Sequence, residues 1–172
     1  SDLRFCLVPT EIFEFQYRAP MPMLFQAFDF VVHGKDLAGV LEDLRRKPVS
    51  DTWVRRLTYA RVFLAALEAI AKVGVVHGDL KPENVHLIED SGIAAGYRPY
   101  LIDMDASILT DRKAPWDGNT GYIGTPRYFS PEHVSGRIPL PASDVFTASL
   151  MLHELLCVRR PYPDYGGPDE IR

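Results

Sequence analysis

The sequence predicts an α+β fold that is mainly helical, with short strands and hairpins carrying polar loops. Three observations favour this class. Residues 52–73 and 144–157 place apolar side chains at helical spacing. Four short apolar runs are bounded by turn residues, as strands are: residues 3–8, 23–32, 85–88 and 100–102. Residues 105–141 are rich in glycine and proline without clear periodicity, and such a long irregular stretch is usually functional or disordered.

The N-terminal part of the chain is expected to form strands. Residues 3–8 and 23–32 are apolar and aromatic, and prolines lie in the connections around them. Proline marks strand boundaries because it cannot donate a ladder hydrogen bond. Residues 36–41 then take helical spacing that continues toward Arg45, which predicts a short helix.

The strongest helical pattern spans residues 52–73. Ser50-Asp51-Thr52 offers a side-chain N-cap, and Gly74 stands where glycine commonly ends a helix. Five apolar side chains recur at intervals of three and four, so we expect them to form one buried face. They are Leu57, Ala60, Leu64, Leu67 and Ala71.

The second half of the chain alternates short strands with loops before a last helix. Residues 85–88 and 100–102 predict two small strands, and the segment between them, with two glycines, predicts a loop. A helix over about residues 144–157 is expected to begin at Ser143 or Asp144 and to be buried by its apolar side chains.

Composition limits the classes of function. The chain has 172 residues, 47% hydrophobic and 24% charged, which suits one globular domain rather than a disordered segment. A net charge of −4 leaves no basic excess for a nucleic-acid partner. Cys6 and Cys157 form neither a disulfide framework nor a metal-binding motif. Because no apolar run is long enough to span a membrane and no signal segment opens the chain, we predict a cytoplasmic location.

Three polar clusters interrupt the apolar pattern. Residues 77–84 read His-Gly-Asp-Leu-Lys-Pro-Glu-Asn and follow the long helix, and residues 103–105 read Asp-Met-Asp after a strand. Residues 124–132 close the irregular stretch with Gly-Thr-Pro-Arg-Tyr-Phe-Ser-Pro-Glu. The first two clusters lie in loops that begin or end short strands, where functional side chains are common.

The residue types in these loops suit phosphoryl transfer. Asn84 and Asp103 offer oxygen ligands to a hard cation such as Mg²⁺, which keeps waters and borrows phosphate oxygens. Asp79 is a candidate base or hydroxyl-orienting group. Lys81 is a candidate cation for the charge that develops on a transferred phosphate.

These motifs resemble the C-terminal lobe of a eukaryotic-type Ser/Thr protein kinase. Residues 77–84 match the catalytic loop H-R-D-x-K-P-x-N except for Gly78 at the arginine position. Residues 103–105 stand where D-F-G stands, and residues 130–132 where A-P-E stands. Asp144 matches the buried aspartate that hydrogen-bonds the catalytic-loop backbone in this family. Four motifs in the family's order make the resemblance specific.

The resemblance covers roughly residues 23–170 and implies a kinase-like architecture. Residues 1–27 would be a remnant of the small-lobe strands, residues 28–34 the hinge, and residues 35–172 an incomplete large lobe. Asp29 and Val31 in the hinge, together with His86, would then contact the adenine of ATP.

The implied reaction transfers the γ-phosphoryl group of ATP to a Ser or Thr hydroxyl of a protein substrate. Asp79 would accept or orient the hydroxyl proton, and Lys81 would neutralise the γ-phosphate. Thr125 would link these two residues to the substrate loop. Asn84 and Asp103 would hold Mg²⁺. Lys81 and the Gly-Thr-Pro sequence that contains Thr125 resemble the Ser/Thr class rather than the tyrosine class.

Departures from the family keep two alternatives open. No G-x-G-x-x-G loop or V-A-I-K lysine occurs. We therefore expect this sequence to be a kinase domain truncated at both ends, without kinase activity by itself. Asp105 replaces a glycine, and His86 replaces the aliphatic residue under adenine. Both favour a pseudokinase that acts as a binding or scaffold module. A phosphotransferase for small molecules is the other alternative, disfavoured by residues 124–126. Glu132 would lack the arginine that pairs with it from a later helix.

Overall fold

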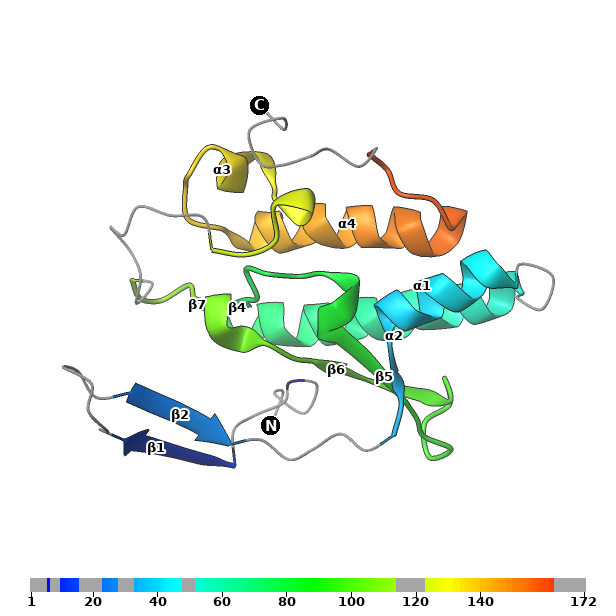
Figure 1. Cartoon of the computed structure of the whole chain (residues 1–172), viewed down its shortest axis with the longest axis horizontal. Coiled ribbons are helices and arrows are strands. Elements are labelled where there is room, and N and C mark those ends of the chain that lie inside the picture. Colours follow the sequence, from blue (N-terminus) through cyan, green and yellow to red (C-terminus); the bar gives the residue numbers. More distant parts are fainter. Residues whose placement is uncertain are drawn as a thin grey trace.

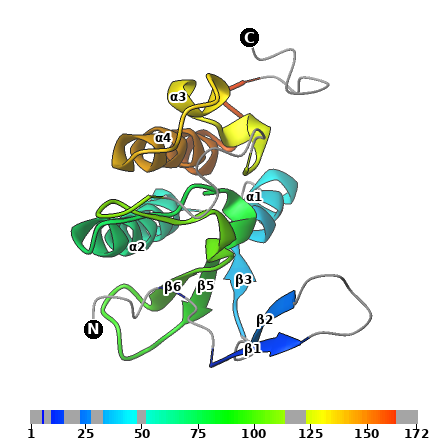
Figure 2. The ribbon, with the colours of Figure 1, turned by 90° about the vertical axis from the view of Figure 1, so that its left-hand side faces the viewer.

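The computed structural model describes residues 6, 10–15, 23–27, 33–47, 52–113 and 123–162. Its two long helices are α2 (Trp53–Lys72) and α4 (Pro141–Cys157), which pack against each other. Figure 2 shows α4 above α2, with the short strands below α2. The predicted α+β class, mainly helical with small sheets, is confirmed.

A separate two-stranded ribbon lies at the N-terminal side of the molecule (Figure 1). Strands β1 (Glu11–Phe15) and β2 (Met23–Ala27) pair antiparallel, with Phe13 opposite Phe25. The sequence did not predict β1, whose residues Glu-Ile-Phe-Glu-Phe do not follow the strict polar–apolar alternation of a half-buried strand. Of the two predicted strands, 23–32 is confirmed over its first five residues and its remainder lies outside the described residues. Of residues 3–8 only Cys6 is described, and it forms a parallel bridge with Leu101.

Helix α1 (Leu37–Arg46) confirms the short helix that was predicted after residue 36. Asp36 caps it, because its side chain accepts a hydrogen bond of 2.7 Å from the backbone nitrogen of Gly39. Its apolar side chains Val40 and Leu44 face the core, and Arg45 and Arg46 lie in its last turn, where basic residues complement the helix dipole.

Helix α2 begins and ends within one residue of the prediction. Thr52 is its N-cap and accepts from the backbone nitrogen of Arg55 at 3.4 Å. Gly74 follows the helix with a φ of +73°, a conformation that glycine adopts without steric cost.

The predicted buried face of α2 was partly wrong. Leu57 and Leu64 are 50% and 42% exposed, and Ala71 is exposed too. Helix α2 carries apolar side chains on most sides, so apolar residues spaced by three and four can be found on more than one of its faces. Packing against α4 and the sheet selects the face that is buried. That face consists of Tyr59, Ala60, Val62, Phe63, Ala66, Leu67 and Ile70.

A three-stranded antiparallel sheet supports the loops of interest. Its order is β3 (Lys35–Asp36), β5 (Val85–Glu89) and β6 (Tyr97–Leu101). The two predicted strands are therefore confirmed, but β6 begins three residues earlier than expected. Pro99 pairs with Leu87 in this sheet, and proline is tolerated there because β6 is the last strand in the order. A second small pair joins β4 (Val75–Val76) to β7 (Ile108–Leu109).

The irregular stretch contains short elements that the sequence did not predict. Three-residue 3-10 helices occupy Met104–Ala106 and Pro126–Tyr128, and α3 spans Pro131–Val134. Helix α4 begins at Pro141, earlier than predicted, because proline suits the first helical position and the Leu140 nitrogen donates to Ser143 Oγ at 2.8 Å.

Among the described residues, no helix has the length and apolar character needed to cross a membrane.

Candidate active site

The catalytic-loop residues lie directly after β4, above the end of α2. Lys81 Nζ donates to Asp79 Oδ2 at 2.9 Å and to Thr125 Oγ1 at 3.3 Å. Thus three predicted site residues from two distant segments meet around one ammonium group. Both charged side chains are largely shielded, with exposed fractions of 22% for Lys81 and 11% for Asp79. Burial is the largest single influence on the pKa of Lys81 and lowers it, but the hydrogen bond to Asp79 and the nearby carboxylates of Asp79, Asp103 and Glu83 together raise it above its usual value, so Lys81 remains a cation.

The second carboxylate oxygen of Asp79 has an unusual environment. Asp79 Oδ1 is buried and has no hydrogen-bond partner among the described residues. Buried polar atoms are normally satisfied, and an exception calls for an explanation such as a catalytic role. A hydroxyl group entering beside Lys81 would supply the missing donor.

Asp144 holds the catalytic loop in place from the first turn of α4. Its two carboxylate oxygens accept from the backbone nitrogens of His77 at 2.7 Å and Gly78 at 3.2 Å. This is the contact that the resemblance to kinases implies for Asp144, and it is confirmed. Burial raises the pKa of Asp144 from 3.8 to about 6, although the two N–H donors lower it.

This raised pKa predicts a pH dependence of stability. A carboxyl group that holds its proton more tightly when folded contributes its full stabilisation below about pH 4 and loses it as pH rises through 6. The free energy of unfolding of the native protein should therefore fall relative to Asp144→Asn between pH 4 and 7. The expected change is on the order of 2–3 kcal/mol, measured by denaturant unfolding at each pH. A difference between the two proteins that does not vary with pH would contradict this assignment.

His77 connects the catalytic loop to the segment that carries Asp103. The ring is buried, its Nε2 lies 3.1 Å from the Ile102 carbonyl oxygen, and its Nδ1 accepts from the Asp79 nitrogen at 3.4 Å. Burial lowers the pKa of His77, so the ring is neutral and carries its proton on Nε2. His77 is therefore a structural residue that fixes the spacing between Asp79 and Asp103.

Asn84 and Asp103 fit the role of cation ligands. Asn84 Nδ2 donates to the Asp79 carbonyl oxygen at 2.9 Å, which leaves the side-chain oxygen of Asn84 to act as a ligand. The Ile102 nitrogen donates to the Asn84 carbonyl oxygen at 3.1 Å, so Asp103 follows immediately beside Asn84. No group of three His, Cys, Asp or Glu side chains in the described parts of the chain forms a metal cluster. Two oxygen ligands suit Mg²⁺ that is shared with phosphates.

Asp103 and Asp105 have different backbone conformations. Asp103 has a φ of +58°, whereas Asp105 lies inside the 3-10 helix Met104–Ala106. An aspartate at the family's glycine position therefore causes no left-handed backbone strain here. Asp105 is exposed, so its carboxylate adds negative charge near the site without being buried.

Gly78, which replaces the family's arginine, is required by its surroundings. Its φ is +79°, and a Cβ atom at this position would lie 2.5 Å from the Ala106 carbonyl oxygen. A side chain would therefore force the 3-10 helix after Asp103 away from the catalytic loop. Glycine allows the two backbones to approach closely.

Gly78→Ala should lower stability more than left-handed strain alone, which costs about 1–3 kcal/mol. Gly96→Ala is the matched control, because Gly96 has a φ of +75° and open space where a Cβ would lie. Thermal unfolding of both variants measures the difference. Equal losses would show that the contact with Ala106 imposes no constraint.

Sequence reasoning missed a buried carboxylate that contacts the segment after Thr125. Glu154 of α4 is 2% exposed, and its oxygens accept from Tyr128 Oη at 3.1 Å and from Arg45 Nη2 at 3.4 Å. Thr147 Oγ1 also donates to the Tyr128 carbonyl oxygen at 2.7 Å. These bonds fix the segment after Thr125 on α4. An acidic residue in an apolar helix was the available signal, since a buried charge needs partners.

Glu132 has a partner within the chain. Ser143 Oγ donates to Glu132 Oε1, and this bond lowers the pKa of Glu132. In place of the arginine that the family would supply from a later helix, Glu132 therefore has Ser143 as a hydrogen-bond partner. This contact joins α3 to the start of α4.

The predicted nucleotide contacts are only partly described. His86 lies on β5 opposite Asp36 and Tyr100. Its Nδ1 is buried and has no hydrogen-bond partner among the described residues. Asp29 and Val31 lie outside the described residues, so the hinge from 28 to 34 stays a prediction, as do the other two domain boundaries.

The contacts of Lys81 with Asp79 and Thr125 bring together the residues for which the resemblance to kinases implies catalytic roles. Residues 22–171 match the protein kinase domain, and the chain belongs to that family. The serine/threonine-protein kinases PkaA and PkaB of Streptomyces coelicolor are each 35% identical to it, over 87% and 82% of the chain. The serine/threonine-protein kinase PknE of Mycobacterium tuberculosis is 33% identical over 77%. The chain spans 28%, 36% and 21% of these relatives' own lengths.

Proposed function

We propose that this protein is a Ser/Thr protein kinase that transfers the γ-phosphoryl group of ATP to a protein hydroxyl. The observation that carries the proposal is the contact of Lys81 with both Asp79 and Thr125, beside the unpartnered Asp79 Oδ1. The names of the similar bacterial kinases support the same reaction. We propose a cytoplasmic location as well.

Each residue of the site has a role that its contacts permit. Asp79 Oδ1 accepts the hydrogen bond of the substrate hydroxyl and orients it for attack. Lys81, kept cationic by Asp79, stabilises the negative charge on the transferred group. Thr125 ties this pair to the segment that Tyr128 anchors on α4.

Asn84 and Asp103 would hold Mg²⁺, which when bound supplies charge neutralisation for the phosphates of ATP. The hydrogen bond from Asn84 Nδ2 to the Asp79 carbonyl oxygen orients the Asn84 side chain. The same loop therefore positions both the side-chain oxygen of Asn84 and the carboxylate of Asp79. His77 and Asp144 hold that loop through hydrogen bonds. Catalysis would then rest on positioning and electrostatics.

A pseudokinase that acts as a binding or scaffold module is the second candidate. His86 favours it, because a buried nitrogen without a donor or acceptor among the described residues lies at the position proposed to face adenine. The flat face of the adenine ring offers no hydrogen bond to that nitrogen, so the nitrogen would stay unsatisfied at a free-energy cost of about 1–3 kcal/mol. Asp105 favours it as well through its added negative charge.

The experiment compares acceptors for phosphate from ATP labelled at the γ-phosphorus. Because this stretch is expected to be inactive by itself, a complete kinase domain that contains it is incubated with Mg²⁺ and either casein or a panel of small hydroxyl compounds. The proposal expects label in casein only. Label in a small compound would identify a small-molecule phosphotransferase, and MgATP binding without any transfer would identify a pseudokinase.

A further inference from the structure

A buried histidine lies close to the candidate active site and has no role in the mechanism described so far. His133 belongs to α3 and is 7% exposed. Its backbone nitrogen donates to Ser130 Oγ at 3.4 Å, so the N-cap of α3 helps to fix its place. A polar side chain that is buried this deeply normally has partners, and the partners of His133 come from the segment that carries Thr125.

The face of the His133 ring stacks on Phe129. The two ring centres are 3.9 Å apart, and the ring planes are inclined by 21°. Phe129 is itself buried, and its backbone nitrogen donates to the Pro126 carbonyl oxygen at 3.1 Å. Stacked rings have a preferred relative geometry, so His133 limits both the position and the tilt of the Phe129 ring.

The edge of the same ring contacts the residue before Gly124. Burial lowers the pKa of His133, whereas a hydrogen bond with the Ile123 backbone and the charges of Asp79 and Glu132 raise it by less. The ring is therefore neutral at pH 7 and has one N–H. His133 thus contacts Ile123 and Phe129, which lie on either side of the turn formed by residues 124–128.

This turn lies against the catalytic aspartate. A Cβ atom on Gly124 would be 3.1 Å from Phe129 Cε1 and 3.4 Å from Asp79 Oδ1. The next residue, Thr125, accepts a hydrogen bond from Lys81. Asp79 Oδ1 is the oxygen that we propose to orient the acceptor hydroxyl. The backbone at Gly124 therefore forms one side of the space beside that oxygen, and Phe129 supports this backbone.

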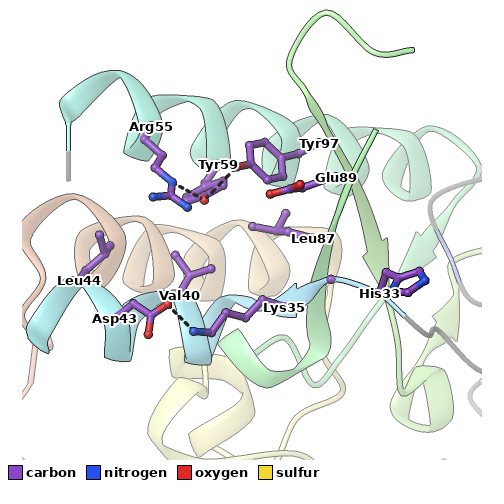
Figure 3. Close-up of a pocket in the computed structure, with 11 residues that line it drawn as sticks. His33, Lys35, Val40, Asp43, Leu44, Arg55, Tyr59, Leu87, Glu89 and Tyr97 are labelled. Atoms are coloured by element: carbon purple, nitrogen blue, oxygen red, sulfur yellow. Dashed lines mark hydrogen bonds and ion pairs between the residues drawn. The ribbon is translucent and has the colours of Figure 1, made fainter. Parts of the chain in front are cut away.

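The support from His133 differs from the other contacts of this segment. Tyr128 is fixed on α4 by its bonds with Glu154 and Thr147, whereas His133 holds the part of the segment next to Asp79. The arrangement is also separate from the pocket of about 340 Å³ between α1, the first turns of α2 and the β5–β6 hairpin (Figure 3), because none of residues 123–134 lines that pocket.

We propose that His133 is a positioning residue for phosphoryl transfer, which acts through Phe129 and Ile123 to hold the Gly124 turn against Asp79. In this role the ring does not touch the substrate or the metal. It fixes the direction from which an acceptor hydroxyl approaches Asp79 Oδ1. The effect on the reaction rests on the proposed kinase function, whereas the effect on the turn does not.

The kinetic test uses His133→Leu in a complete kinase domain that contains this stretch. Leucine keeps an apolar side chain in the buried site but removes the flat face and the N–H. We expect kcat toward casein to fall by at least about tenfold, because a misplacement of about 1 Å can cost about 100-fold. The KM for ATP should stay near the native value, which a general loss of structure would not produce. His133→Phe keeps the stacked face and should recover part of the lost kcat.

The second measurement does not depend on turnover. The amides of Tyr128 and Phe129 donate to the carbonyl oxygens of Thr125 and Pro126, so they report on the turn by hydrogen exchange. His133→Leu should speed their exchange, His133→Phe should speed it less, and the amides of α2 should exchange as in the native domain. If the native domain transfers no phosphate, this result alone decides whether His133 holds the turn.

His153→Leu is the matched control. His153 lies on α4, and its Nε2 has no hydrogen-bond partner among the described residues. The same substitution there should leave kcat and the exchange of Tyr128 and Phe129 as in the native domain. Native kcat in His133→Leu, unchanged exchange of the two amides, or equal effects of the His133 and His153 substitutions would overturn the proposal.

Discussion

Asp79→Asn is expected to reduce phosphoryl transfer by at least about 100-fold, the usual scale for loss of a positioned base. Asp79 Oδ2 is already bonded to Lys81, and Oδ1 is the buried oxygen without a partner. An amide group keeps the shape but loses the negative charge that orients the hydroxyl and holds Lys81. MgATP affinity should change little, because Asp79 is not one of the proposed metal ligands. Initial rates and calorimetry measure the two effects.

Asp111→Asn is the matched control for this substitution. Asp111 undergoes the same chemical change but is exposed, with a side-chain exposure of 69%, and pairs with Arg112 on the surface. Its variant should transfer phosphate at the native rate. If Asp79→Asn also keeps native turnover, Asp79 does not have the proposed role.

Asp103→Ala is expected to abolish Mg²⁺-dependent binding of ATP. Asp103 is the carboxylate proposed to complete the ligand pair with Asn84, and the backbone bond from Ile102 to Asn84 places it there. Loss of a direct ligand should exceed the roughly 10–100-fold effect that outer partners of a metal site produce. Calorimetric titration with MgATP measures the loss.

Asp105→Gly tests the neighbouring carboxylate separately. It restores the family's glycine at an exposed position of the 3-10 helix, and metal-dependent binding should persist or strengthen. If Asp105→Gly loses the metal while Asp103→Ala keeps it, the assignment of the ligand is displaced by two residues.

Local signals in the sequence predicted helices α1, α2 and α4 and two strands of the three-stranded sheet, β5 and β6, but not β3. Thr52 and Gly74 mark the ends of α2, because capping depends on neighbouring residues alone. The buried face of α2 depends on α4 and the sheet, which lie far away in the sequence. Leu57 and Leu64 therefore matched the helical pattern and are nevertheless exposed. Strand β1 was missed because its five residues, Glu-Ile-Phe-Glu-Phe, lack a regular alternation of polar and apolar side chains.

The candidate site was predictable where one loop supplies several residues in a fixed order. Asp79, Lys81 and Asn84 belong to such a motif, and the contact of Lys81 with Thr125 followed only from the resemblance. Glu154 was not found, because its partners come from α1 and from the segment after Thr125. Spacing along one chain segment carries no information about partners that folding brings together.

The most direct test of the proposed activity is phosphoamino-acid analysis of casein after incubation with a complete kinase domain that contains this stretch, Mg²⁺ and ATP labelled at the γ-phosphorus. The proposal expects label on serine or threonine, dependent on Mg²⁺ and lost in Asp79→Asn. Label on tyrosine would contradict the Ser/Thr class. Casein without label, from a protein that binds MgATP, would contradict kinase activity itself.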